Sequence, residues 1–388
     1  MNNYVHDIPT KICFGKGSIS YLKQSLQQFG NRVLMTYGGG SVKKSGLYDE
    51  ILKILNDEFE IFELSGIEPN PRISSVIKGV EICKENDIDV ILAVGGGSTI
   101  DCSKAIACGV YYEGDDLWDM ITHYEKDRKA LPLIDILTLS ATGSEYDNSA
   151  VISNPDTNEK IGAVLTFPSV SICDPTYTFS VSKYQTASGS IDIMSHIMEG
   201  YFSVTDDSDL YDGIAETVLK SVIKNMPIAL EQPDNYSARA NLMADASIAC
   251  SGIPEYGKEV GSWPCHAMEH ELSAYYDITH GVGLAILTPR WMRHIVEKDP
   301  SCKWRFVRFA RNVWGLEGND EDELVKAGID ALEDFFRKSG VPMSLSELNI
   351  DETNFKAMAA HANRNGKLER GFVPIREEDI EAIYTACP

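Results

Sequence analysis

The stretch that decides the fold is DVILAVGGGSTIDCSKAIACGV, residues 89–110. Its first third has the apolar, β-branched residues of a buried strand, and the part after three glycines has the small and apolar residues of a buried helix. Glycines at such a junction permit positive φ and let a ligand approach the backbone closely, and the helix N-terminus offers N–H groups to a pyrophosphate. The spacing is not G-x-G-x-x-G, and alone it is equally typical of a tight βα connection.

The flanking residues repeat the alternation of strand and helix. RVLMTY (32–37) and EIFELSG (60–66) are typical of strands, RISSVIKGVEICKEN (72–86) has a helical period, and LPLIDILTLSATGSE (131–145) runs from a strand into a loop. This order predicts an α/β fold with a parallel sheet and helices on both faces. A two-stranded hairpin is expected within 150–167.

The pattern becomes helical beyond Asp174-Pro175, where the proline marks a boundary. We therefore predict an α/β dinucleotide-binding domain at residues 1–180 and an all-helical domain at residues 181–388. The latter carries the candidate metal ligands described below.

Composition narrows the function classes. The chain has 388 residues, 43% of them hydrophobic, and a formal net charge of −23 without a basic patch. Such a polyanion is repelled by nucleic acid and anionic membranes, and no apolar run is long enough to span a bilayer. The nine cysteines include no Cys-x-x-Cys pair, which is typical of reduced thiols. We expect a cytoplasmic protein without nucleic-acid or membrane partners.

Two further loops resemble ligand-binding turns. One is a second triple glycine after the first strand, followed by a serine and lysines, and the other is the hydroxyl-rich loop after the strand at 131–137. Loops at the carboxyl ends of parallel strands line one crevice, so together they favour nucleotide binding. The candidate residues in these loops are Gly38, Gly39, Gly40, Ser41, Lys43, Thr138, Ser140, Thr142 and Ser144.

A second group of residues suggests a metal site. In SIDIMSHIMEG (190–200), Asp192 and His196 stand one helical turn apart, and WPCHAMEHELSAYYDITHG (263–281) contains His266, His270 and His280. One carboxylate and three imidazoles without a thiolate suit Fe²⁺ or Zn²⁺. Each residue alone is more often a solvated or hydrogen-bonded side chain, but three histidines within fifteen residues are harder to explain that way.

A rival motif overlaps this group. Residues 266–270 match H-x-x-E-H, in which both histidines bind zinc and Glu269 activates water in a protease. That interpretation leaves Asp192, His196, His280 and every glycine turn unexplained. A non-enzymatic nucleotide-binding protein would need no cluster of ligands.

Several segments together resemble the iron-containing, or group III, alcohol dehydrogenases over almost the whole chain. They are FGKGS (14–18), AVGGGSTIDCSKAIA (93–107), LTLSATGSE (137–145), DPTYTFSVSKYQTASGSIDIMSHIMEGYF (174–202) and the histidine segment. Within the family, TYGGGSVKKSG (36–46) and DDLWDMI (115–121) resemble the butanol-dehydrogenase type, which reduces aldehydes with NADPH. One departure is ASGSIDIMSH, where many relatives carry Thr-Gly-Met-Asp-Ala, and another is Cys265 beside His266.

The resemblance assigns roles by position. It implies that the metal ligands are Asp192, His196, His266 and His280. It makes His270 a nearby non-ligand histidine and our candidate catalytic residue, and it denies Glu269 the role of general base. The residues it places at the cofactor are Gly95, Gly96, Gly97, Ser98, Asp101, Thr138, Ser144 and Lys160.

The expected activity is that of an NADP-dependent alcohol dehydrogenase, which transfers hydride between NADP(H) and a small aldehyde or primary alcohol at one divalent metal ion, Fe²⁺ or Zn²⁺. NAD-using relatives carry an aspartate where this chain has Gly39, and Lys43 follows nearby. The family also suggests a homodimer. The alternatives within the fold are NAD-dependent polyol oxidation and a dehydroquinate-synthase-like reaction, and the H-x-x-E-H hydrolase lies outside it.

Overall fold

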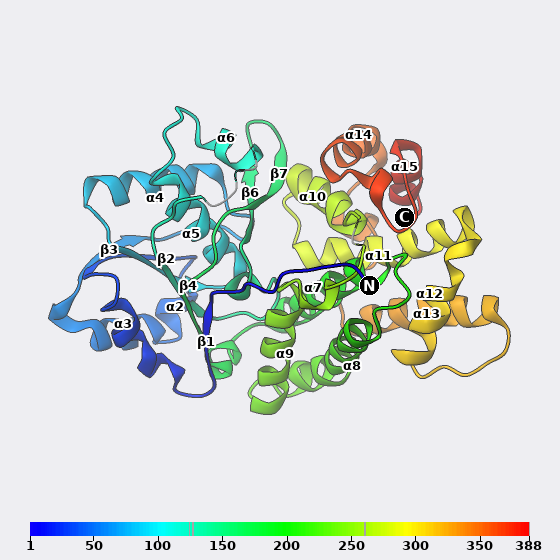
Figure 1. Ribbon diagram of the computed structural model, residues 1–388, viewed down its shortest axis with the longest axis horizontal. Coiled ribbons are helices and arrows are strands. Elements are labelled where there is room, and N and C mark those ends of the chain that lie inside the picture. The colour runs from blue at the N-terminus through cyan, green and yellow to red at the C-terminus, as the bar shows by residue number, and fades with distance from the viewer. Residues whose placement is uncertain (124, 126–127, 260, 388) are drawn as a thin grey trace. The chain divides into compact units, whose positions relative to one another are not determined.

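The computed structural model describes residues 1–123, 125, 128–259 and 261–387 (Figure 1). The chain forms two compact units. An α/β unit contains Asp7–Val181 and Pro233–Ser251, and a helical unit contains Met1–His6, Ser182–Gln232 and the described residues from Gly252 onward.

These units differ from the predicted domains 1–180 and 181–388 in two segments. Helix α9 (Tyr236–Ala249) belongs to the α/β unit, because Ser247 donates a hydrogen bond of 2.6 Å to Glu145 there. The first six residues belong to the helical unit, where Tyr4 stacks on Tyr256 at a centroid distance of 4.6 Å.

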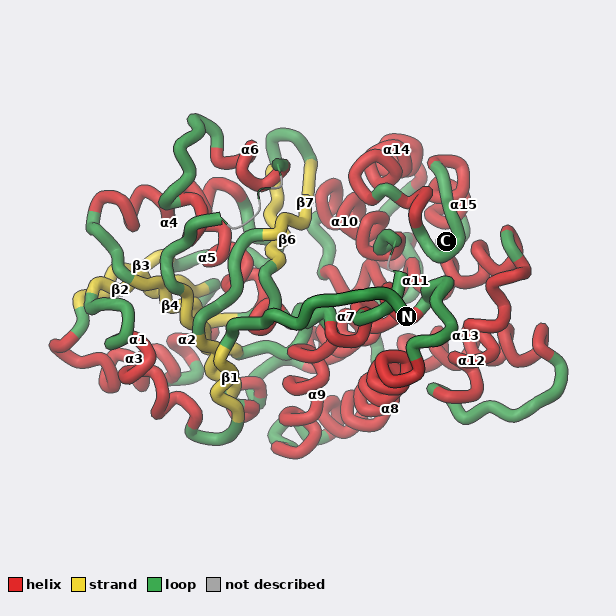
Figure 2. Tube along the Cα trace, in the orientation of Figure 1, coloured by secondary structure: helices red, strands yellow, loops and turns green. Residues whose placement is uncertain are grey.

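The α/β unit contains a six-stranded parallel sheet in the order β1-β8-β5-β4-β2-β3, which confirms the predicted parallel α/β fold. Figure 2 shows the strands in yellow. Its strands are β1 (Lys11–Phe14), β2 (Arg32–Tyr37), β3 (Glu60–Leu64), β4 (Val90–Gly95), β5 (Leu133–Leu137) and β8 (Val170–Cys173). The predicted hairpin is confirmed as antiparallel β6 (Ser149–Asn154) and β7 (Glu159–Val164), with Ile152 opposite Ile161.

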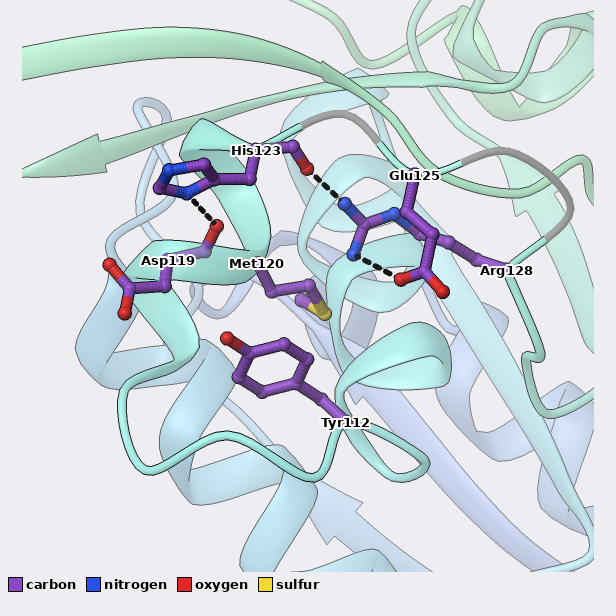
Figure 3. Close-up of a pocket in the computed structure, with 6 residues that line it drawn as sticks. All are labelled: Tyr112, Asp119, Met120, His123, Glu125 and Arg128. Carbon is purple, nitrogen blue, oxygen red and sulfur yellow. Dashed lines mark hydrogen bonds and ion pairs between the residues drawn. The ribbon is translucent and has the colours of Figure 1, made fainter.

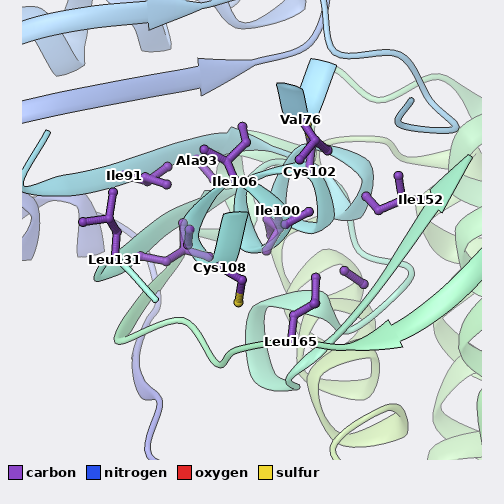
Figure 4. Close-up of a cluster of buried hydrophobic side chains, with 14 of the residues drawn as sticks. Val76, Ile91, Ala93, Ile100, Cys102, Ile106, Cys108, Leu131, Ile152 and Leu165 are labelled. Atoms are coloured by element: carbon purple, nitrogen blue, oxygen red, sulfur yellow. The ribbon is translucent and has the colours of Figure 1, made fainter. Parts of the chain in front are cut away.

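Alternate residues of the central strands build one hydrophobic core on each face of the sheet, as the two-residue period of a strand requires. On one face, Leu34, Ile91 and Ala93 pack with helices α4 (Ile73–Glu85) and α5 (Gly97–Gly109) (Figure 4). On the other, Val33, Met35 and Leu92 pack with the shorter helices α1 (Leu22–Leu26) and α3 (Leu47–Leu55). The sheet is therefore covered on both faces, as the nearly continuous apolar strands predicted.

Described residues beyond Cys173 form helices and loops without a strand. The longer helices are α7 (Lys183–Tyr201), α8 (Asp209–Glu231), α10 (Pro264–Tyr276), α11 (His280–Lys298), α12 (Lys303–Asn312), α13 (Glu321–Lys338), α14 (Phe355–Gly366) and α15 (Glu377–Thr385). None of the helices that the structure describes has the length and apolar character needed to cross a bilayer. The structure pairs none of the nine cysteines in a disulfide.

Candidate metal centre and nucleotide site

Three helices of the helical unit bring the four predicted metal ligands together. Asp192 and His196 lie one turn apart on α7, His266 lies in the first turn of α10, and His280 is the first residue of α11. Asp192 Oδ1 lies 3.7 Å from His196 Nε2, 3.8 Å from His266 Nε2 and 3.5 Å from His280 Nε2. The predicted ligand set is therefore one cluster in space.

The spacing of these atoms suits an ion rather than direct hydrogen bonds. Two ligands about 2.1 Å from a tetrahedral Zn²⁺ or similar ion lie roughly 3.4 Å apart, close to the distances measured from Asp192 Oδ1. Asp192 Oδ1 and His266 Nε2 are buried and lack a hydrogen-bond partner among the described residues. A buried carboxylate oxygen without a partner is costly, and a bound divalent cation removes that cost. The donor set fits the metal that the sequence predicted.

The electrostatics of the cluster also favour a positive charge at its centre. Burial by itself raises the pKa of Asp192, but the surrounding imidazoles hold that pKa well below its ordinary value. Burial lowers the pKa of His196 to about 3. Burial also opposes the charge on His266, yet the nearby carboxylates of Asp192 and Glu199, the second of which accepts a hydrogen bond from His266 Nδ1, raise its pKa to about 9.

Two glycines allow α11 to carry His280 into the cluster. A Cβ on Gly281 would lie 2.1 Å from the Ser188 carbonyl oxygen of α7, and a Cβ on Gly283 would lie 2.7 Å from Glu269 Cγ of α10. Any side chain at either position would push α11 away from its neighbours. The two glycines of HGVG, after Thr279, are thus needed because α11 packs closely on its neighbours, and not because the backbone has unusual angles there.

Glu199 and Glu269 contact predicted ligand histidines, and the sequence analysis gave neither this role. The Glu199 carboxylate accepts hydrogen bonds from His266 N (2.9 Å) and His266 Nδ1 (3.1 Å). Glu269 is fully buried and accepts hydrogen bonds from His280 Nδ1 and Ser273 Oγ. The rejection of Glu269 as a water-activating base stays a prediction. The signal for Glu199 was its place three residues after His196, on the same helix.

His270 lies beside the cluster and remains partly exposed. Its ring centroid is 5.6 Å from that of His280 and 6.3 Å from that of His266. It also lies close to Glu269 and His280, with one candidate ligand atom of each within 4.8 Å of the others. The position is compatible with the predicted non-ligand role, and the catalytic role stays a prediction.

In the α/β unit, the glycine turn at residues 95–97 joins β4 to α5 as predicted, but the reason for its glycines is different. None of the three has positive φ. A Cβ on Gly97 would lie 2.1 Å from Thr142 Oγ1, so the glycine lets the hydroxyl-rich loop pack against the start of α5. The N-cap residue Gly96 has no side chain that could cap α5, and the N–H groups of Thr99 and Ile100 donate to its carbonyl oxygen. The start of such a helix can bind an anion such as a pyrophosphate through its remaining N–H groups.

Several predicted cofactor residues instead make contacts within the α/β unit. Asp101 is buried and accepts hydrogen bonds from Ser144 Oγ (2.5 Å) and Val151 N (2.8 Å), and Ser98 Oγ donates to the Pro69 carbonyl. These side chains hold loops in place, a common use of short polar groups near turns. Their predicted contact with the nucleotide stays a prediction.

Other predicted cofactor residues with hydroxyl groups lie in the loop after β5, and Lys160 lies in the hairpin. Thr142 Oγ1 accepts a hydrogen bond from Ser144 N, while Thr138 and Ser140 are half-buried in the loop after β5. Lys160 lies in β7 opposite Ser153, with its side chain mostly buried.

The second glycine turn, Gly38–Gly40, follows β2 and leaves open space. Gly39 is exposed, and nothing lies within 4 Å of the position its Cβ would take. Ser41 and Lys43 belong to the short helix α2 (Ser41–Lys44). Lys43 Nζ lies 4.4 Å from the ring centroid of Tyr48 and 3.9 Å from Glu63. The sequence analysis missed this tyrosine and glutamate, which come from α3 and β3.

One hollow in the α/β unit contains none of the predicted site residues (Figure 3). It is lined by Tyr112, Asp119, Met120, His123, Glu125 and Arg128. Arg128 donates a hydrogen bond to the His123 carbonyl, and its guanidinium lies 3.9 Å from the Glu125 carboxylate. This arrangement is typical of a structural surface hollow.

The fold and the two sites together define a metal-binding enzyme with an α/β nucleotide fold. The family model described as "Iron-containing alcohol dehydrogenase" matches residues 9–175, and the model "Fe-containing alcohol dehydrogenase family, C-terminal" matches residues 186–387. The chain belongs to the iron-containing alcohol dehydrogenase family, as the resemblance implied.

Similar proteins include both cofactor types. The chain is 50% identical over 99% of both chains to "NADH-dependent butanol dehydrogenase A" of Clostridium acetobutylicum. It is 36% identical to "NADPH-dependent aldehyde reductase YqhD" of Escherichia coli, over 96% of this chain and 95% of the other. Among solved structures, "NADH-dependent butanol dehydrogenase A" of Thermotoga maritima matches with a TM-score of 0.93 and 39% identity, over 100% and 99% of the two chains. The protein is thus an alcohol dehydrogenase with a nicotinamide cofactor and a metal.

Proposed function

We propose that the protein interconverts small aldehydes and primary alcohols, of about the size of butyraldehyde and butanol, with NADP(H) at one Fe²⁺ or Zn²⁺ ion. The observation that carries this proposal is the buried cluster in which Asp192 Oδ1 faces three imidazole Nε2 atoms at 3.5, 3.7 and 3.8 Å. When bound, the ion supplies Lewis-acid polarisation of a carbonyl oxygen and the nicotinamide supplies a hydride.

The protein's own residues would supply binding, orientation and a proton. Asp192, His196, His266 and His280 would hold the ion, and the uncapped start of α5 would bind the pyrophosphate. His270 is not one of the four ligands and stays partly exposed, so we assign it proton transfer to and from the substrate oxygen at an imidazole nitrogen. The half-buried ring of Trp263, 5.6 Å from that of His196, would exclude water from one side of the cluster.

The proposed preference for NADPH rests on the turn at Gly38–Gly40. Gly39 brings neither bulk nor negative charge, and Lys43 is an exposed residue on the adjacent helix, with its Nζ 3.9 Å from Glu63. A phosphate accepts strong charge-assisted hydrogen bonds from such a group. The relatives carry names with either cofactor, so the preference is argued from these residues alone.

One experiment tests the proposed function directly. Protein freed of metal by chelation is reconstituted with Fe²⁺ or Zn²⁺, and oxidation of NADPH and of NADH by butyraldehyde is followed by absorbance. We expect metal-dependent turnover with a higher kcat/KM for NADPH. Full turnover without metal would contradict the assigned centre, and equal kcat/KM values would contradict the cofactor preference. The homodimer, the cytoplasmic location and the lack of nucleic-acid and membrane partners stay predictions.

A further inference from the structure

Carboxylates link the three ligand-bearing helices in succession. Glu199 on α7 accepts two hydrogen bonds from His266 on α10, at 2.9 and 3.1 Å. Glu269 on α10 accepts a hydrogen bond from His280, the first residue of α11. In both pairs the imidazole uses Nδ1, and its Nε2 faces Asp192.

We propose that Glu199 and Glu269 are positioning residues that fix the tautomer and the ring orientation of His266 and His280. A neutral imidazole carries one proton, and a carboxylate that accepts a hydrogen bond at Nδ1 holds the proton there. The lone pair is then on Nε2, the atom that faces the other ligands. This inference rests on the proposed metal centre, and it adds the residues that prepare its ligands before the ion arrives.

The third histidine shows why only two acceptors are needed. His196 shares α7 with Asp192, so the helix itself fixes the geometry of this pair. Its Nδ1 has no hydrogen-bond partner among the described residues. Its ring stacks on that of His266, with centroids 4.7 Å apart and an interplanar angle of 22°. Acceptors are therefore present where a ligand must be aligned across two helices.

The burial of the two glutamates supports the same role. Their side chains are 3% and 0% exposed, for Glu199 and Glu269 respectively. Together with Asp192 they place three buried carboxylates around three histidines, and a divalent ion would offset two of these negative charges. Gly283 leaves the space that Glu269 occupies, because a Cβ there would lie 2.7 Å from Glu269 Cγ. The packing is thus built around the glutamate.

Replacing each glutamate with Leu and with Gln tests the proposal. Leu removes both the charge and the acceptor, whereas Gln keeps an acceptor oxygen. The readouts are Zn²⁺ affinity by competition with a chromophoric chelator, and the visible absorption spectrum of the Co²⁺-loaded protein. We expect the Leu variants to bind Zn²⁺ roughly 10- to 100-fold more weakly, with an altered Co²⁺ spectrum, and the Gln variants to lie between them and the unmodified protein.

The matched control is Glu271→Gln. Glu271 lies on the same helix as Glu269, is also buried, and lies 3.4 Å from His361, which is not one of the predicted ligands. We expect its Zn²⁺ affinity and Co²⁺ spectrum to match those of the unmodified protein. A Leu variant that folds and keeps unmodified affinity and spectrum would overturn the positioning role. If the Leu variants fail to fold, unmodified values in the Gln variants would overturn it instead.

These outcomes differ from a failure of the proposed function. If the unmodified protein binds neither Zn²⁺ nor Co²⁺ at the cluster, the metal centre itself is wrong. If it binds both and the glutamate variants bind equally well, only the positioning role is wrong.

Discussion

The metal cluster of the helical unit offers side-chain atoms to its ion, whereas the glycine turn of the α/β unit offers backbone groups to its anion. The cluster consists of side chains from three helices, and buried atoms such as Asp192 Oδ1 remain without partners among the described residues. At the turn, the neighbouring polar side chains are occupied, since Asp101 binds Ser144 and Val151, and the available groups belong to the backbone. One site depends on which side chains are present, and the other depends on where side chains are absent.

The largest effect should follow from removing a ligand. His280→Ala should reduce metal affinity by more than the roughly 100-fold upper range for outer-shell changes, and aldehyde reduction should fall below detection. NADPH binding should persist, because the glycine turns belong to the other unit. Metal stoichiometry and a fluorescence titration with NADPH measure the two effects.

The control for this variant is His361→Ala, which changes a partly exposed histidine on α14. It should keep both metal and activity. Equal metal content in the His280 and His361 variants would remove the basis for treating the cluster as a set of ligands.

The second-largest effect should follow from adding a side chain at the glycine turn of the α/β unit. Gly97→Val should weaken NADPH binding by at least about tenfold, since its Cβ would lie 2.1 Å from Thr142 Oγ1 and displace the loop from the start of α5. Metal content should stay unchanged. The matched control is Gly213→Ala on α8, where nothing lies within 4 Å of the added Cβ. Unchanged NADPH affinity in the valine variant would contradict the close-approach role of the glycine.

A third effect concerns a buried acid beside the hydroxyl-rich loop. Burial raises the pKa of Glu145 to about 7 from an ordinary value of 4.5, even though Ser247 Oγ donates a hydrogen bond to it. The unfolded chain therefore loses this proton at a lower pH than the folded protein does. Ionisation of Glu145 thus lowers the free energy of unfolding progressively as pH rises from 4.5 to 7, by roughly 3 kcal/mol in total. Below pH 4.5 the effect is absent.

Glu145→Gln removes this titration. The variant should lose less stability than the unmodified protein between pH 5 and pH 8, and its Tm at pH 8 should be higher. Thermal unfolding followed by circular dichroism at several pH values gives the comparison, with Glu81→Gln at an exposed position of α4 as the control. Parallel Tm curves for the variant and the unmodified protein would show that Glu145 does not titrate in this range.

The smallest effect concerns the choice of cofactor. Gly39→Asp places a carboxylate in the open space of the first glycine turn, where it would repel a 2′-phosphate. We expect the ratio of kcat/KM for NADPH to that for NADH to fall about tenfold, while metal content and stability stay the same. A Gly39→Asn variant separates charge from bulk, and an equal fall in that variant would assign the effect to bulk.

Much of the fold could be predicted, because the alternation around residues 89–110 depends on local periodicity and on glycines at strand ends. The resemblance to a family named the four predicted metal ligands, and the structure brings these residues together, while their role as ligands stays a prediction. The packing of α9 with the α/β unit could not, since an amphipathic helix does not specify which partner it covers. The contacts of Asp101 and Glu199 could not be predicted either. A sequence does not show whether a carboxylate binds a cofactor or accepts a hydrogen bond from a neighbouring residue.

The path of the chain also constrains when the α/β unit can form during synthesis. Strand β1 pairs with β8, so Lys11 meets Val170 only after most of the sheet has been made. Helix α9 completes the same unit from residues that follow the 51-residue segment Ser182–Gln232 of the helical unit. Because such distant contacts require long loops to close, the α/β unit cannot be completed on the ribosome until residue 251 has emerged. By then the helix that carries Asp192 and His196 has already left the exit tunnel, whereas His266 and His280 have not yet emerged.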